Sequence, residues 1–182
     1  MDRYLLVRLA TEADGLRYPD PRYVDLLMPA GIEPPANRAA LAGQSSCALL
    51  VRALLRACGC THPVLLRPYR VGRAVSDVIQ IARDAGAWHE PGDAERPAAG
   101  DAVIVGAPGH EHAYVVTAVR SHAPGWRVDS IDGGQGAHGA GIAARTRSWP
   151  DWAREWVDVV DAGAGAPEMA RPVRGWADVG LL

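Results

Sequence analysis

The side chain best suited to covalent chemistry in this sequence is the thiol of Cys47, which we expect at the first turn of a helix. Ser45 and Ser46 can cap that helix, and apolar side chains recur at helical spacing over residues 49–57. Gly59 stands where the helix should end. Unpaired backbone N–H groups and the positive end of the helix dipole favour a thiolate there and can also hold a developing oxyanion. The pattern predicts a nucleophilic cysteine, the alternative being an ordinary small buried hydrophobe.

A nucleophilic thiol needs a base, and His112 is the histidine best placed to serve as one. It opens the run 112–119, which is rich in β-formers and predicts a central strand. Because side chains alternate along a strand, His112 should share a face with Tyr114 and Val116. His110 follows a Pro-Gly pair, and we expect it in the preceding turn. The alternative is a structural histidine at a strand start.

A third group should orient the imidazole, and we expect Asp132 in this role because it ends the next predicted strand. Asp132 can also be read as an ordinary turn-initiating aspartate. Gln135, three residues further on, stays as the alternative third residue. We expect the backbone N–H of Cys47 to donate to the oxyanion together with the side chain of Gln44 or Ser45.

The elements that must position these residues follow the order helices first, strands afterwards, which is the α+β pattern. A second amphipathic helix is expected from Arg73 to Ala85. The short β-rich runs that come after it are separated by Gly/Pro turns and predict an antiparallel meander. These runs are 102–105, 112–119 and 126–131, with further strands at 142–147 and 156–160.

Length and composition limit the organisation and the partners. A chain of 182 residues suits one domain, here with a lead-in or cap at 1–43, a catalytic domain at 44–161 and a tail at 162–182. The net charge of −2 argues against a nucleic-acid partner, and no apolar run is long enough for a membrane span. Arg8 interrupts the first apolar run, so no signal peptide is visible. We expect a monomer, cytoplasmic as synthesised or exported by a non-classical route.

Three segments downstream of Cys47 resemble the cysteine peptidases and amidases of the NlpC/P60 and CHAP type. They read AGDAVIV at 99–105, GHEHAYVVT at 109–117 and VDSIDGGQ at 128–135. In that papain-like superfamily a Cys opens a helix, Gly-Asp precedes the first core strand, a His opens the second, and an acid or amide on the third orients the His. The resemblance covers roughly residues 44–135. It implies a papain-like α+β fold in which the nucleophile-bearing helix packs on an antiparallel sheet.

The resemblance also implies an activity. Cys47, His112 and Asp132 would cleave an amide bond through a thioester, without a cofactor, in a peptide or in peptidoglycan. The protein would then be a bacterial wall hydrolase or a wall-attacking toxin, for which a secretion or immunity partner is expected. Nothing in the sequence selects which bond is cleaved.

Two other functions remain open. The first is a non-catalytic binding module on the same scaffold, for which Trp149, Trp152 and Trp156 at helical spacing could form an aromatic stripe, although core packing is the simpler use. The second is zinc binding, because soft and imidazole ligands cluster at two places. These candidate zinc ligands are Cys58, Cys60 and His62, or His110 and His112.

Overall fold

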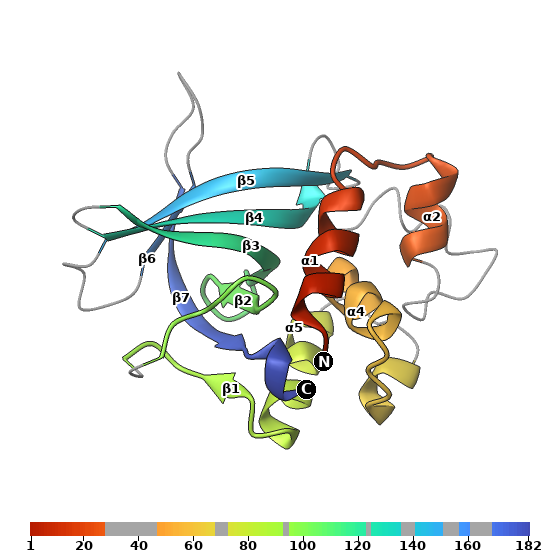
Figure 1. Cartoon of the computed structure of the whole chain (residues 1–182), viewed down its shortest axis with the longest axis horizontal. Helices are drawn as coiled ribbons and strands as arrows, with labels where there is room; N and C mark the ends of the chain where they lie inside the picture. The colour runs from red at the N-terminus through yellow and green to blue at the C-terminus, as the bar shows by residue number, and fades with distance from the viewer. Residues whose placement is uncertain are drawn as a thin grey trace.

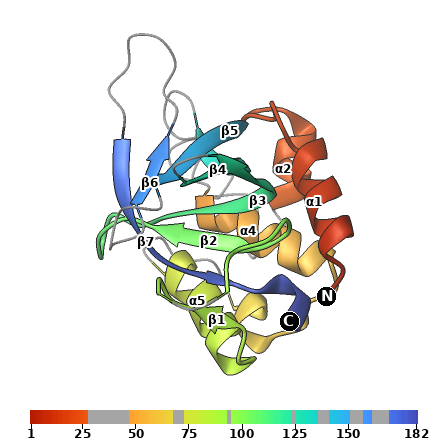
Figure 2. The same cartoon turned by 60° about the vertical axis from the view of Figure 1, so that its left-hand side comes forward.

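Six antiparallel strands form a closed barrel in the computed structural model of the chain, and the helices gather on one side of it (Figures 1 and 2). The structure describes residues 1–27, 47–67, 73–92, 95–122, 125–135, 141–150, 157–160 and 169–182. The barrel strands are β2 (Ala102–Val105), β3 (His112–His122), β4 (Gly125–Gln135), β5 (Gly141–Pro150), β6 (Val157–Val160) and β7 (Met169–Ala177).

Strand β7 closes the barrel. The first part of β7 pairs with β6, with Val160 opposite Met169, and the second part pairs with β2, with Ala102 opposite Ala177. The remaining strands follow in sequence order from β2 to β6. The short strand β1 (Trp88–His89) pairs with the free side of β7 and stays outside the barrel.

The fold class predicted from the sequence, a papain-like α+β fold, is wrong. The predicted antiparallel strands exist, but β7 pairs with both β6 and β2, so that six strands close into a barrel instead of forming a papain-like sheet. The closing strand lies in the segment 162–182, which we set apart as a tail. In β7, Pro172 and Gly175 interrupt the simple alternation that marks a strand in sequence, and Pro is disfavoured inside sheets.

The individual elements agree with the sequence far better than the fold class does. The helix expected around residues 45–59 is α4 (Cys47–Ala57), and the helix expected at 73–85 is α5 (Ala74–Asp84). The expected strands at 102–105, 112–119, 126–131, 142–147 and 156–160 correspond to β2 through β6. Trp149 lies in β5 rather than in a helix, while Trp152 and Trp156 lie outside the described residues.

The two faces of β3 border two separate apolar clusters. Tyr114 and Val116 point into the barrel, where they meet Trp149 of β5. Ala113 and Val115 point outward and belong to the cluster that the helices complete. The alternation predicted for this strand is therefore confirmed, and it sends His112 to the same side as Tyr114.

Helix α4 is the central helix of the outer cluster, because every residue from Cys47 to Leu55 is buried. A helix that is buried on all sides must have partners around it, and α4 packs against β3, β4, α1, α2 and α5. Its position brings its first residue to the wall of the barrel. The other helical elements are α1 (Arg3–Glu12), α2 (Pro21–Leu27), η2 (Pro63–Leu66) and η4 (Val179–Leu181). None of the helices in the described ranges has the length and hydrophobicity needed to cross a membrane.

The two ends of the chain are joined by buried Asp101. Its carboxylate accepts hydrogen bonds from the backbone N–H of Ala98 at 2.8 Å and of Val179 at 3.1 Å, and Arg3 lies 3.2 Å away. Burial raises the pKa of Asp101 to about 6, although these hydrogen bonds and Arg3 oppose the rise. Asp101 is thus a structural residue, which ties α1 to η4. The two ends of the chain lie close together (Figure 2).

Candidate active site

Cys47 and His112 meet where α4 abuts the barrel. Cys47 is the first residue of α4, and His112 is the first residue of β3. The thiol lies within hydrogen-bonding reach of the imidazole, and it raises the pKa of that ring. Cys47 is 6% exposed and His112 is 9% exposed, so only a small part of each residue is accessible to solvent. The low exposure strengthens their mutual electrostatic interaction.

Asp132 holds the other side of the His112 ring. Nε2 of His112 lies 2.7 Å from Oδ2 of Asp132. The β3–β4 register accounts for this contact, because Tyr114 stands opposite Asp132 and His112 is the next residue of β3 on the same face. Since Nε2 is committed to the carboxylate, Nδ1 is the ring nitrogen left to exchange a proton with Cys47. The structure thus brings together the three residues predicted to be catalytic, in the order thiol, imidazole, carboxylate.

The charge of His112 follows from these contacts. Burial by itself would lower the pKa of His112, but the hydrogen bonds to Asp132 and Cys47, together with their charges, raise it to about 9. The ring therefore carries its second proton at neutral pH. Because the interaction is reciprocal, the imidazolium favours the thiolate form of its neighbour.

Asp132 is itself fixed by three donors. Besides His112, Ser130 donates from Oγ to Oδ1 at 2.7 Å, and Arg147 donates from Nη2 to Oδ2. Burial would raise the pKa of Asp132, but the His112 hydrogen bond and the Arg147 charge hold it below its usual value. The carboxylate, 1% exposed, is therefore ionised and cannot rotate without breaking these bonds. It is well suited to hold the imidazole in one orientation.

A second carboxylate, Asp158, is also buried inside the barrel and pairs with Arg147. Nη1 of Arg147 donates to Oδ2 of Asp158 at 2.8 Å. Oδ1 of Asp158 accepts from Tyr114 at 3.1 Å and from Trp149 at 3.0 Å. The guanidinium also lies 4.0 Å from the centroid of the Tyr114 ring. A continuous polar network thus runs from the middle of the barrel to Asp132.

The local sequence around Arg147 and Asp158 does not indicate this network. Arg147 was placed at the end of a predicted strand without a role, and Asp158 lies among valines in β6. The available signal was the alternation of β5, which puts Arg147 on the same face as Trp149, a residue expected in the core. The carboxylates lie on β4 and β6, the strands that flank β5, but the register that decides which residues of these strands meet Arg147 is not specified by strand order.

The other predicted site residues are not at the imidazole. Gln135 was the alternative third residue, but its Oε1 accepts from Arg145 and its Nε2 donates to the carbonyl of Gly133 at 3.2 Å. Asp132, rather than Gln135, contacts His112. Gln44 and Ser45, the expected oxyanion donors, lie outside the described residues.

The contacts of the histidines disfavour the predicted zinc sites. Nδ1 of His62 accepts from the backbone N–H of Val64 at 3.3 Å, and Nε2 faces Asp84 at 3.3 Å. To bind a zinc ion, a His62 ring nitrogen would have to give up one of these contacts and offer its lone pair to the metal. His110 lies exposed in the turn before β3, and His112 is engaged in the inward network.

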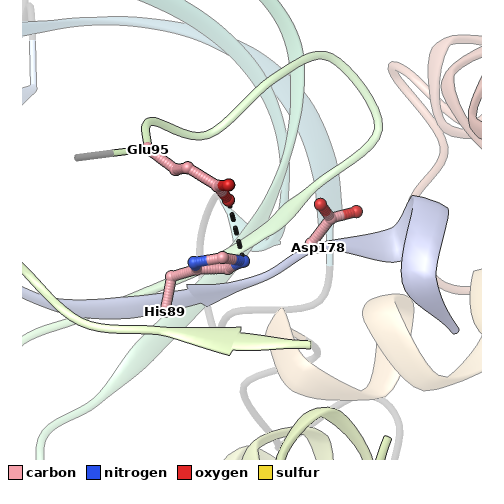
Figure 3. Close-up of side chains that lie close together, drawn as sticks. All are labelled: His89, Glu95 and Asp178. Carbon is pink, nitrogen blue, oxygen red and sulfur yellow. Dashed lines mark ion pairs between the residues drawn. The ribbon is translucent and has the colours of Figure 1, made fainter. Parts of the chain in front are cut away.

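Figure 3 shows the group of described residues best placed to hold a metal ion. His89 of β1, Glu95 and Asp178 offer ligand atoms that lie within 4.8 Å of one another. Nε2 of His89 is 3.4 Å from Glu95, and its ring stacks on Trp176 with centroids 5.3 Å apart. Nitrogen and oxygen ligands of this kind suit a first-row transition metal. Asp178 is already paired with Arg3, however, and His89 with Glu95. Ion pairs within the chain therefore account for the arrangement of His89, Glu95 and Asp178.

Comparisons with known protein families, with curated proteins and with solved structures find no match to this chain. The resemblance to NlpC/P60 and CHAP enzymes therefore stays a prediction that depends on the quoted segments. The chemistry of the site has to be argued from the contacts of Cys47, His112 and Asp132 themselves.

The protonation of His112 can be measured directly. We expect its ring signals in two-dimensional NMR to titrate near pH 9, and the midpoint to fall in Cys47→Ala and in Asp132→Asn, since each removes a contact that raises the pKa. An unfolded histidine loses its proton near pH 6.5, so the stabilisation that His112 contributes is complete below about pH 6.5 and is lost as the pH rises through about 9. A wild-type midpoint at or below 6.5 would contradict the contacts described here.

Proposed function

We propose that this protein is a cysteine-dependent hydrolase that cleaves an amide bond through a thioester intermediate. Cys47 is the nucleophile, His112 is the general acid and base, and Asp132 orients the imidazole. The observation that carries the proposal is the unbroken line of contacts from thiol to imidazole to carboxylate, in which the imidazole is charged at neutral pH. Such a thiolate–imidazolium pair is the activated form of a cysteine nucleophile.

The first half of the reaction forms the thioester. The Cys47 thiolate attacks the carbonyl carbon, a C–S bond forms, and the carbonyl electrons move to oxygen. His112 then gives its Nδ1 proton to the amide nitrogen as the C–N bond breaks, and the amine leaves. Asp132 keeps the imidazole aligned throughout, because its hydrogen bond to Nε2 does not need to change.

The second half of the reaction restores the enzyme. His112 is now neutral and takes a proton from water as the water oxygen attacks the thioester carbon. The C–S bond breaks, the acid product is released, and the thiolate is regenerated beside the imidazolium.

The first turn of α4 supplies a place for the developing negative charge. Cys47 is the first residue of the 11-residue helix α4, so its backbone N–H lies at the positive end of the helix dipole. A backbone donor aimed at the oxyanion lowers the barrier to its formation.

The NlpC/P60 and CHAP resemblance implies a narrower class of substrates than the geometry of the site does. The site supports attack on an amide carbonyl. Peptides, and the peptide portion of peptidoglycan in particular, are the substrates that the NlpC/P60 and CHAP resemblance implies. We propose them as the first substrates to examine, with a secretion or immunity partner as a further prediction of the same resemblance.

The proposal is tested by thiol labelling followed by product analysis. Iodoacetamide at pH 7 should alkylate Cys47 at least about tenfold faster than Cys58, because burial raises the pKa of the Cys58 thiol. Site occupancy is followed by mass spectrometry of digested protein. In parallel, the protein is incubated with soluble peptidoglycan fragments and a mixed peptide pool, and new amine and carboxyl ends are identified.

Two outcomes would oppose the proposal. Equal, slow labelling of Cys47 and Cys58 would mean that the thiol is not activated, which favours a non-catalytic binding module. New chain ends that still appear after complete alkylation of Cys47 would place the nucleophile elsewhere.

A further inference from the structure

Arg145 lies on the inner face of the barrel, on the strand that pairs with the Asp132 strand. Along β5 the inward residues include Trp149 and Arg147, and alternation adds Arg145 to this set. Ile142 belongs instead to the outer cluster that the helices cover. Arg145 is opposite Ser130 of β4, and Ser130 itself donates to Asp132.

The guanidinium of Arg145 is held at the end of the barrel where the catalytic contacts lie. Its Nε and Nη2 both donate to Oε1 of Gln135, at 3.0 and 2.7 Å. Gln135 is the last residue of β4, three residues beyond Asp132, so the guanidinium lies on the His112 side of that carboxylate. At about 3.4 Å per strand residue, the Cα atoms of Asp132 and Gln135 are on the order of 10 Å apart.

Arg145 differs from Arg147 in what neutralises it. Arg147 faces Asp132 and Asp158 and is 2% exposed. Arg145 is only partly buried, and in the described part of the chain its polar contacts are the two to the neutral Gln135 side chain. Those contacts use the Nε–Nη2 edge of the guanidinium. The Nη1–Nη2 edge remains, and it matches the two oxygens of a carboxylate.

We propose that Arg145 binds a carboxylate of the substrate, so that the preferred substrates are acidic peptides with a free carboxylate close to the scissile amide. This inference rests on the function proposed above and adds a substrate class to it. Gln135, which sequence analysis considered as a catalytic residue, is then the positioning residue of the binding group, because it fixes the Arg145 guanidinium in one orientation.

The charge preference can be measured at Cys47 without a known substrate. Iodoacetate and iodoacetamide alkylate a thiolate by the same displacement of iodide, but only iodoacetate carries a carboxylate. We define the charge ratio as the iodoacetate rate over the iodoacetamide rate at Cys47, divided by the same ratio for N-acetylcysteine. We expect this ratio to be at least about ten in the wild type at low salt, and to fall as salt is added.

The variant Arg145→Gln is expected to lower the charge ratio about fivefold or more, and Arg145→Lys to retain part of it. His112 also attracts iodoacetate, so the difference between variants, and not the wild-type value alone, carries the test. Arg120→Gln is the matched control, because Arg120 is a strand arginine that is 65% exposed and pairs with Asp129 at 2.8 Å. Its charge ratio should stay within about twofold of the wild type.

Failure of this inference can be told apart from failure of the proposed function. If Cys47 is no more reactive than Cys58 toward either reagent, the proposed function fails. If Cys47 is selectively reactive but Arg145→Gln and Arg120→Gln give the same charge ratio, only the carboxylate site is overturned. Once a cleaved peptide is known, replacing a Glu beside the scissile bond by Gln should lower kcat/KM about tenfold in the wild type and leave Arg145→Gln nearly unaffected.

Discussion

Replacement of Cys47 by alanine is expected to yield a folded protein whose amide hydrolysis falls about ten-thousandfold or more. The substitution removes the only atom that forms the covalent intermediate, and losses of this size are typical when a nucleophile is deleted. It removes one buried sulfur atom and leaves His112 bound to Asp132, so the free energy of unfolding should change by about 1 kcal/mol or less. Rates are compared at equal protein concentration, and stability by urea unfolding.

Cys58→Ala is the matched control for this variant. Cys58 is a partly buried thiol just past the end of the same helix and has no place in the proposed reaction. Its hydrolysis rate should stay within about twofold of the wild type. If Cys47→Ala retains a tenth or more of the wild-type rate while folding normally, hydrolysis does not pass through this thiol.

The three residues of the candidate active site were predictable because each has a local signature. Cys47 is followed by apolar side chains at helical spacing, and His112 begins a run of β-formers after a Pro-Gly turn. Asp132 precedes two glycines at the end of a strand. Consecutive antiparallel strands usually pair with each other, so neighbouring positions on β3 and β4 could be inferred from strand order alone.

The closure of the barrel was not predictable in the same way. It depends on β6 meeting β7, and β7 also inserts beside β2, a strand far away in the chain. The alternation of β7 is broken at Pro172 and Gly175, and the backbone of Gly175 approaches β1 so closely that a Cβ would lie 2.3 Å from the carbonyl oxygen of His89. A strand shaped by close approach to its neighbours lacks the regular pattern by which strands are recognised.

The interior charges escaped prediction for a related reason. Arginine and aspartate are exposed in most proteins, so single-sequence reasoning assigns them to the surface. Asp132 of β4 and Asp158 of β6 lie on the two strands that flank β5, and closure of the barrel encloses the space in which they meet Arg147. The burial of these charges escaped prediction because it follows from the closure of the barrel, whereas their strand neighbours follow from chain order.

The second large effect is expected from Arg147→Met, which should lower the free energy of unfolding by about 3–5 kcal/mol. Methionine fills much of the same space but leaves two buried carboxylates without their shared cation. Asp132 keeps His112 as a positive neighbour, whereas the described contacts leave Asp158 with only the neutral donors Tyr114 and Trp149. Removal of one partner from a buried ion pair typically costs this amount.

A double variant separates charge from packing in this prediction. Adding Asp158→Asn to Arg147→Met removes the uncompensated charge, and we expect it to restore about 1–3 kcal/mol of the loss. Arg174→Met is the matched control, since Arg174 forms a 2.6 Å ion pair with Glu111 that is partly exposed, and the loss there should be about 1 kcal/mol or less. All variants are compared by urea unfolding at pH 7. If Arg147→Met were as mild as Arg174→Met, the barrel interior would tolerate an unpaired carboxylate, and Arg147 could not be what keeps Asp132 ionised beside His112.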